Sequence, residues 1–189
     1  WQPEVVREIR FSDRAPAQAA VLIPIVMHGT DADSMTVLLT ERTAHLSTHS
    51  GQIAFPGGRV DECDVDAPAA AMREAFEEVG LEYRFVQVLG TLPVYVTGTA
   101  FQVTPVVALV QPGFSLQPNA FEVADVFEVP LTFLMNPANH RRHAFDWEGV
   151  RREWFSMPYH EKGDGQVRER FIWGATAGML RNFYRFLLA

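Results

Sequence analysis

The chain of 189 residues has a single cysteine, Cys63, and no long apolar segment. One thiol cannot form an internal disulfide bond or supply a multi-cysteine zinc site, and it suits a reducing compartment. The most apolar runs, AAVLIPIVM and VTPVVALV, fall far short of the ~20 residues that span a bilayer. The N-terminal stretch WQPEVVREIR shows no signal-peptide pattern. We therefore expect a cytoplasmic protein with no membrane partner.

Basic side chains are also scarce. Lys and Arg number 16 against 23 Asp and Glu, which gives a formal net charge of -7. Because affinity for a nucleic acid backbone comes mainly from basic contacts, this balance argues against a nucleic acid partner. A polyanionic small-molecule substrate would need cations or a local basic patch. The length and the ordinary apolar fraction predict one globular domain over residues 1–189.

Short β-rich runs fill the first half of the chain. Residues in HGTDAD join two of them into a hairpin, and PGG ends a third. Later runs should complete a mixed sheet, and HRRHAFDW with RREWFSMPY resembles a second hairpin around residues 148–150. The expected strands are Val21–Val26, Met35–Thr40, Gln52–Phe55, Val86–Leu89, Leu92–Val96 and Val103–Val110. With helices interleaved, this pattern indicates an α/β fold.

Two segments are predicted to be helical. Pro68 suits a first turn, Gly80 suits the position just past a C-terminus, and the residues between them favour helix, so we expect a helix over Ala67–Val79. The segment WGATAGMLRNFYRFLL has the periodicity of an amphipathic helix.

The first helix carries Glu74, Glu77 and Glu78 in its last turns, where the macrodipole is negative. A step of about 100° per residue puts all three carboxylates within an arc of roughly 100°. Carboxylates three and four positions apart repel by roughly 0.2–0.5 kcal/mol per pair, so local stability does not explain the arrangement. The opposite face is expected to pack on the core through Ala69, Met72, Phe76 and Val79.

A divalent cation is the simplest partner for these carboxylates. Oxygen ligands suit Mg²⁺ or Mn²⁺, which would cancel the repulsion and bind phosphate oxygens. Small side chains at Ala70 and Ala71 would leave room above the acidic face, and Arg73 could hydrogen-bond a glutamate and hold its orientation. A solvated acidic face is the alternative reading of such a helix.

The segment Gly57–Leu81, GGRVDECDVDAPAAAMREAFEEVGL, resembles the Nudix box. Its core matches at Arg73, Glu74, Glu77, Glu78, Gly80 and Leu81. The spacing from Gly58 to Arg73 is one residue longer than the commonest form, and the usual upstream glutamate is absent, with Asp64 or Asp66 nearby.

The preceding segment Leu38–Gly58, LLTERTAHLSTHSGQIAFPGG, resembles the marker of the coenzyme A pyrophosphatase branch of Nudix hydrolases. That branch has the same one-residue extension. Thr43 replaces a small Ser or Ala, and Ser47 stands where the branch has an arginine, so one anion contact is in doubt. The matches are Leu38, Leu39, Thr40, Arg42, Gly51, Phe55, Pro56, Gly57 and Gly58.

The resemblance implies a Nudix-type α/β/α sandwich that hydrolyses the diphosphate of coenzyme A to 3′,5′-ADP and 4′-phosphopantetheine. It implies Mg²⁺ or Mn²⁺ held by Glu74, Glu77 and Glu78, with Glu74 or Glu122 as the general base. Substrate contacts are expected from Arg42, Gly57, Gly58 and Arg59. Alternatives are hydrolysis of ADP-ribose, dinucleotides or nucleoside triphosphates by the same chemistry, or a nucleotide sensor of the same fold without turnover.

Other groups are weaker candidates. His45 and His49 have the spacing of two zinc ligands on a helix, but the residues around them make a helix doubtful. Hairpin arginines could meet phosphates, and tryptophans could stack on a base, although surface and core roles are commoner for each. These residues are Arg141, Arg142, Arg151, Arg152, Trp147, Trp154 and Trp173.

Overall fold

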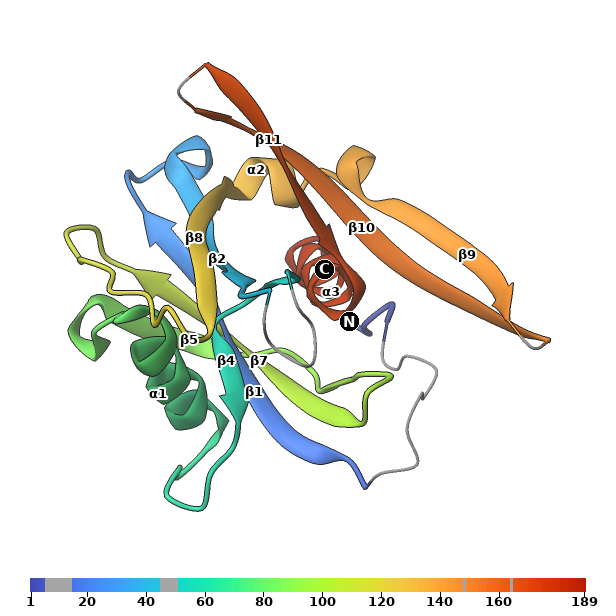
Figure 1. Ribbon diagram of the computed structural model, residues 1–189, viewed down its shortest axis with the longest axis horizontal. Helices are drawn as coiled ribbons and strands as arrows, with labels where there is room; N and C mark the ends of the chain where they lie inside the picture. Colours follow the sequence, from blue (N-terminus) through green and yellow to red (C-terminus); the bar gives the residue numbers. More distant parts are fainter. Residues whose placement is uncertain (6–14, 45–50, 148, 164) are drawn as a thin grey trace.

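The computed structural model describes residues 1–5, 15–44, 51–147, 149–163 and 165–189 (Figure 1). His45, Ser47 and His49 lie outside these residues. The described residues form a larger sheet of eight strands and a smaller sheet of three, with three α-helices. None of these helices has both the length and the apolar character needed to cross a membrane.

The larger sheet is mixed. Strands β1 and β7 are parallel from Ala17 opposite Phe101 to Val26 opposite Val110, and the other pairings are antiparallel. Its strands are β1 (Ala17–Met27), β2 (Met35–Arg42), β3 (Ile53–Ala54), β4 (Gly57–Arg59), β5 (Val86–Thr91), β6 (Tyr95–Val96), β7 (Phe101–Val110) and β8 (Val123–Pro130). The predicted mixed sheet is therefore confirmed.

Strand β1 shows why the sheet is covered on both faces. Its side chains alternate between two hydrophobic clusters, with Ile23 and Ile25 in one and Leu22 and Val26 in the other. A strand buried on both faces must be apolar almost throughout, as VLIPIVM is. Helix α1 (Ala67–Val79) packs on the second cluster, and helix α3 (Gly174–Leu187) packs on the first. The result is the expected α/β/α arrangement (Figure 1).

The smaller sheet lies beyond α3. It contains β9 (Arg141–Trp147), β10 (Val150–Gly163) and β11 (Gln166–Trp173), in the order β11, β10, β9. Helix α3 contacts β10 and β11, so it lies between the two sheets. Helix α2 (Leu131–Leu134) follows β8, and three short 3₁₀ turns cover Ala32–Ser34, Tyr83–Phe85 and Pro137–Asn139. The predicted second hairpin and the C-terminal helix are confirmed.

Helix α1 has the predicted bounds, but its core-facing side was predicted wrongly. Phe76 is 49% exposed and lies against Tyr83, whereas Ala70, Ala71 and Ala75 are buried with Val79. Small alanines let the helix approach β1 and β4 closely, so the alanine side, with Glu78 beside it, packs on the sheet. Ala70 and Ala71 therefore fill the core and leave no open space for a ligand.

Candidate active site

Local sequence fixes both ends of α1. The Asp66 carboxylate accepts a hydrogen bond from the Ala69 N–H at 2.8 Å, which satisfies one free donor of the first turn. Gly80 ends the helix with a φ of 72°, a left-handed conformation that suits glycine. Because the helix also contacts β4, its glutamates lie next to the glycine-rich turn at Gly57 and Gly58.

Glu78 is the most buried of the three carboxylates, at 4% exposure. Its Oε2 accepts a hydrogen bond from the Gly57 N–H at 3.0 Å, and its Oε1 lies 3.7 Å from Nη1 of Arg42. Burial raises the pKa of Glu78 to about 7, although the Gly57 hydrogen bond and the Arg42 charge oppose the rise. The negative charges of Glu74 and Glu122 add to it. The folded protein thus holds an acid whose negative charge is only partly compensated.

Both glycines of β4 are required by close packing. A Cβ on Gly58 would lie 2.5 Å from Cδ of Glu74, and a Cβ on Gly57 would lie 2.4 Å from the Ala20 carbonyl oxygen. Gly57 also has a φ of 155°. Gly58 therefore lets the Glu74 side chain approach β4, and Gly57 lets β4 lie close to β1. Their predicted contact with substrate phosphates stays a prediction.

Arg73 organises the exposed side of the cluster. Its Nη1 donates to Glu74 at 3.0 Å and to Glu77 at 3.1 Å, which confirms the orienting contact expected for this arginine. Its Nε and Nη2 donate to Asp64 at 3.0 and 2.9 Å, and Nη2 also donates to the Arg59 carbonyl oxygen at 3.0 Å. The hydrogen bond from Arg73 lowers the pKa of Asp64 below its ordinary value. The guanidinium thus ties the loop before the helix to the helix itself.

Glu74 is half-buried, and burial raises its pKa even though Arg73 opposes the rise. Glu77 remains 54% exposed at its side chain. Glu122 belongs to the loop before β8, where its carbonyl oxygen accepts from the Thr43 N–H at 3.0 Å and Asn119 Nδ2 lies 3.5 Å from its Oε1. Because the charge of Glu122 raises the pKa of both Glu74 and Glu78, it shares their electrostatic environment.

The donor set fits a divalent cation. Carboxylate oxygens are hard ligands, and buried Glu78 and half-buried Glu74 both have raised pKa values that a nearby cation would lower. Within the described ranges, no three His, Cys, Asp or Glu side chains already converge as a metal-binding group. Glu74 and Glu77 instead contact Arg73, and Glu78 contacts Gly57. The ligand set Glu74, Glu77 and Glu78 therefore stays a prediction.

The remaining candidates lie elsewhere or serve other contacts. The Arg59 guanidinium is 5.5 Å from the centre of the Phe101 ring. Arg142 and Arg151 pair with Glu153 inside the small sheet. Trp154 stacks on His143, and Trp173 precedes α3. The small sheet and α1 lie on opposite sides of the larger sheet (Figure 1), so its arginines and tryptophans do not join the carboxylates.

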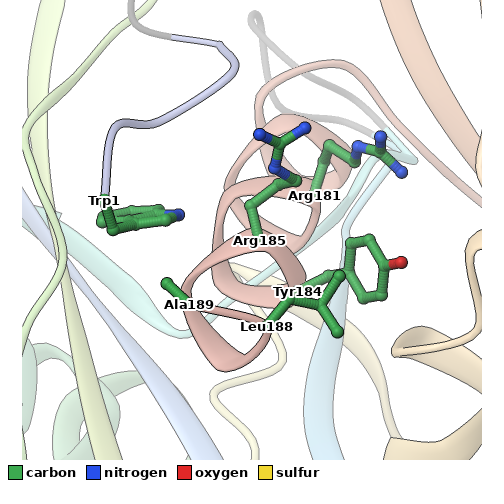
Figure 2. Close-up of a pocket in the computed structure, with 6 residues that line it drawn as sticks. All are labelled: Trp1, Arg181, Tyr184, Arg185, Leu188 and Ala189. Carbon is green, nitrogen blue, oxygen red and sulfur yellow. The ribbon is translucent and has the colours of Figure 1, made fainter.

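Two cavities lie on the α3 side. One, at the end of α3 (Figure 2), has a volume of about 290 Å³. It is lined by Trp1, Arg181, Tyr184, Arg185, Leu188 and Ala189. Two of its lining residues, Arg181 and Arg185, both pair with Glu4. The second, of about 200 Å³, lies between β10 and α3. Neither is lined by a carboxylate of α1.

The sequence did not predict that Asp64 binds Arg73. It offered two acids, Asp64 and Asp66, near the position of the upstream glutamate that this chain lacks. Asp66 caps α1, and Asp64 receives Arg73. Asp64 lies in an irregular loop, so no periodic pattern could show that it reaches the helix.

Comparison with known proteins gives the family. The model of the NUDIX domain matches residues 16–157. An uncharacterized Nudix hydrolase NudL from Escherichia coli (strain K12) is 41% identical over 165 residues, covering 87% of this chain and 79% of that protein. NudL from Enterobacter sp. (strain 638) is 40% identical over 169 residues, with the same coverage of 87% and 79%.

Solved structures agree on the fold. A NUDIX hydrolase from Alicyclobacillus acidocaldarius is 18% identical with a TM-score of 0.52, over 67% of this chain and 84% of that one. A MutT/nudix family protein from Enterococcus faecalis is 18% identical with a TM-score of 0.51, over 93% and 64%. With the family model covering most of the chain, this protein belongs to the NUDIX domain family.

Proposed function

We propose that this Nudix hydrolase cleaves the diphosphate of coenzyme A or its derivatives in a divalent metal-dependent reaction, releasing 3′,5′-ADP and 4′-phosphopantetheine. One observation carries the proposal. Arg42, Gly57 and Gly58, which belong to the segment resembling the coenzyme A branch, lie directly against Glu74 and Glu78 of the Nudix box. The contact between Arg42 and Glu78 supports the proposal that the two segments contribute to one site.

Glu74, Glu77 and Glu78 would hold the metal ion. Mg²⁺ or Mn²⁺ bound there supplies positive charge that neutralises the diphosphate and favours ionisation of a water nucleophile. Arg73 keeps Glu74 and Glu77 in place, since each receives a hydrogen bond from the same Nη1. Arg42 and Arg59 are the proposed phosphate contacts, because guanidinium groups match phosphate oxygens in shape and charge.

A general base must take the proton of the attacking water. Glu74 and Glu122 are the candidates. A base must lie within hydrogen-bonding reach of the proton that it removes, so geometry decides between them first. Glu122 lies on the loop before β8, and its charge raises the pKa of both Glu74 and Glu78. Loss of the proton-transfer step in Glu74→Gln or in Glu122→Gln, seen as a lowered kcat with little change in KM, would identify the base.

A substrate panel tests the proposal. We expect kcat/KM for coenzyme A to exceed the values for ADP-ribose, NADH and nucleoside triphosphates with Mg²⁺ or Mn²⁺ at mildly alkaline pH. Mass spectrometry should show 3′,5′-ADP and 4′-phosphopantetheine appearing together. If dephospho-coenzyme A is cleaved more slowly than coenzyme A, the 3′-phosphate contributes to substrate discrimination. If the two are cleaved equally fast, the pantetheine arm is the main discriminator.

Two results would contradict the proposal in different ways. If the protein cleaves ADP-ribose, a dinucleotide or a triphosphate rapidly and does not cleave coenzyme A, the coenzyme A assignment is wrong. The proposal of metal-dependent Nudix hydrolysis would still hold. Tight nucleotide binding without turnover in any metal would favour a nucleotide sensor.

A further inference from the structure

Strand β9 forms one edge of the small sheet. Strand β9 pairs with β10 along its whole length, from Arg141 opposite Ser156 to Trp147 opposite Val150, without a register shift. On its other side, β9 has no strand partner among the described residues. The backbone groups that point away from β10 are therefore available for pairing with another strand.

The opposite edge of the same sheet differs. Strand β11 contacts β3 of the larger sheet, and it sends Arg168 and Arg170 to Glu41 and Asp125. Natural proteins protect sheet edges by covering them or by bulges, prolines and charges that discourage pairing. Strand β9 contains no proline or bulge, and its charged residues include both signs, Arg142 and Asp146. In Figure 1 it forms the outer side of the small sheet.

We propose that β9 is the contact surface for a second copy of this chain, with the two β9 strands antiparallel across a two-fold axis at Ala144. In antiparallel pairing, hydrogen-bonded positions face hydrogen-bonded positions. Two identical strands can satisfy this rule only if the axis passes through a residue position, which leaves a few discrete registers.

Charge selects one register. With the axis at Ala144, Arg142 lies opposite Asp146 of the second copy, and Asp146 lies opposite its Arg142. An axis at His143 puts Arg142 opposite Ala144, and an axis at Phe145 puts Asp146 opposite Ala144, so neither pairs the charges. Asp146 is exposed and has no ion pair with another described residue. Opposite charges directly across a strand pair stabilise it.

The same register also extends an aromatic face. His143 and Phe145 both pack on Trp154, at ring-centre distances of 5.0 and 5.4 Å, and Phe145 is 43% exposed. The axis at Ala144 places Phe145 of each copy opposite His143 of the other, which gives two aromatic pairs. Cross-strand aromatic pairs favour association, so both faces of the paired strands are complementary.

A pairing of this length is small. We expect it to bury less than the ~1,200 Å² of standard interfaces and the dimer to dissociate in the micromolar range. Light scattering and sedimentation between ~1 and ~200 μM should therefore show a concentration-dependent dimer. A protein that stays monomeric across this range overturns the proposal.

Charge reversal tests the register. Arg142→Asp puts like charges opposite each other at two places, and Asp146→Arg does the same with the opposite sign. Each variant should weaken self-association by at least ~10-fold, equivalent to ~1.4 kcal/mol. A mixture of the two variants restores both opposite-charge pairs, so native mass spectrometry should show the heterodimer in excess over either homodimer. Dimers that are insensitive to both changes would place the interface elsewhere and refute the proposal.

A cross-link gives an independent test, because Arg142 also pairs with Glu153 and its reversal could disturb folding. Directly opposite residues in an antiparallel pair have Cα atoms about 4.5–5.5 Å apart, which a disulfide can span. In a Cys63→Ser background, Ala144→Cys should form a covalent dimer on mild oxidation. The matched control is Gln166→Cys on the β11 edge, which should not form a covalent dimer under the same conditions. Equal cross-linking of the two variants would exclude this register.

Discussion

Two clusters of acidic residues in this protein show opposite electrostatics. In one, Arg170 is 4% exposed and binds Glu41, Asp125 and Glu161 at 2.7–2.8 Å, with its guanidinium 4.0 Å from the Phe127 ring centre. Burial opposes ionisation of Asp125, but the hydrogen bond and charge of Arg170 outweigh it and lower the pKa of Asp125. This cluster fastens β11 to β2 and β8.

The cluster on α1 behaves differently. Glu78 has a raised pKa because one backbone N–H and a guanidinium at 3.7 Å do not offset its burial. Arg170 binds Asp125 directly, whereas the charge of Glu78 is only partly compensated, as we expect of a carboxylate proposed to bind a cation. The two carboxylates therefore differ: the pKa of Glu78 is raised, and the pKa of Asp125, which Arg170 binds, is lowered.

The largest expected effect is on stability. Arg170→Met removes the shared partner of three carboxylates, and we expect the free energy of unfolding to fall by about 3 kcal/mol. Arg168→Met is the matched control: Arg168 pairs with Glu41 and Asp125 but is 54% exposed, so the loss should stay below about 1 kcal/mol. Denaturant titration measures both. Equal losses for the two variants would show that burial of Arg170 does not matter.

The next effect is on catalysis. Glu78→Gln keeps size and can still accept the Gly57 N–H, but it removes the charge. We expect hydrolysis to fall at least ~100-fold, equivalent to ~2.7 kcal/mol of transition-state stabilisation. Glu82→Gln, just after the helix and paired with Arg84, should leave kcat/KM unchanged. Near-normal turnover in Glu78→Gln would remove Glu78 from the catalytic site.

The same substitution should stabilise the metal-free protein. Glu78 has a folded pKa of about 7 against an ordinary value of 4.5, so between these values the folded state binds more protons than the unfolded state. Stability should therefore fall as pH rises from about 4.5 through 7. In EDTA at pH 8, Glu78→Gln should gain about 2 kcal/mol, since the buried amide keeps part of the desolvation cost. An unchanged or lower Tm would contradict the raised pKa.

Divalent cations should give the smallest effect. An ion that binds only the folded state stabilises it by about 1.4 kcal/mol at ten times its Kd. Thermal melts with Mg²⁺, Mn²⁺ or EDTA at pH 8 test this, and the shift in Tm should disappear in Glu78→Gln but persist in Arg168→Met. Identical midpoints for the natural protein over a wide range of metal concentration would argue against the proposed ligand set.

Local chemistry made several elements predictable. Helix α1 has the predicted bounds because Pro68 favours the first turn and Gly80 adopts the left-handed conformation that ends the helix, and both effects are local. The β9–β10 hairpin and α3 also follow from local patterns. Strands β8 and β11 were not predicted, because Asp125, Glu128 and Arg170 interrupt their apolar alternation. Each of these charges has a partner far away in the sequence, such as His28, just after β1, for Glu128 at 2.6 Å, which no local pattern reveals.

Spacing along one helix determined that Glu74, Glu77 and Glu78 share an arc, since the helical period alone sets that angle. Which of the three is buried was decided by tertiary structure. Close packing of the alanine side of α1 on β1 and β4 put Glu78 beneath the Gly57 N–H and left Glu77 exposed. Burial depends on which distant segments meet the helix, so the inequality among these three carboxylates, and with it the raised pKa of Glu78, arises only in the folded protein.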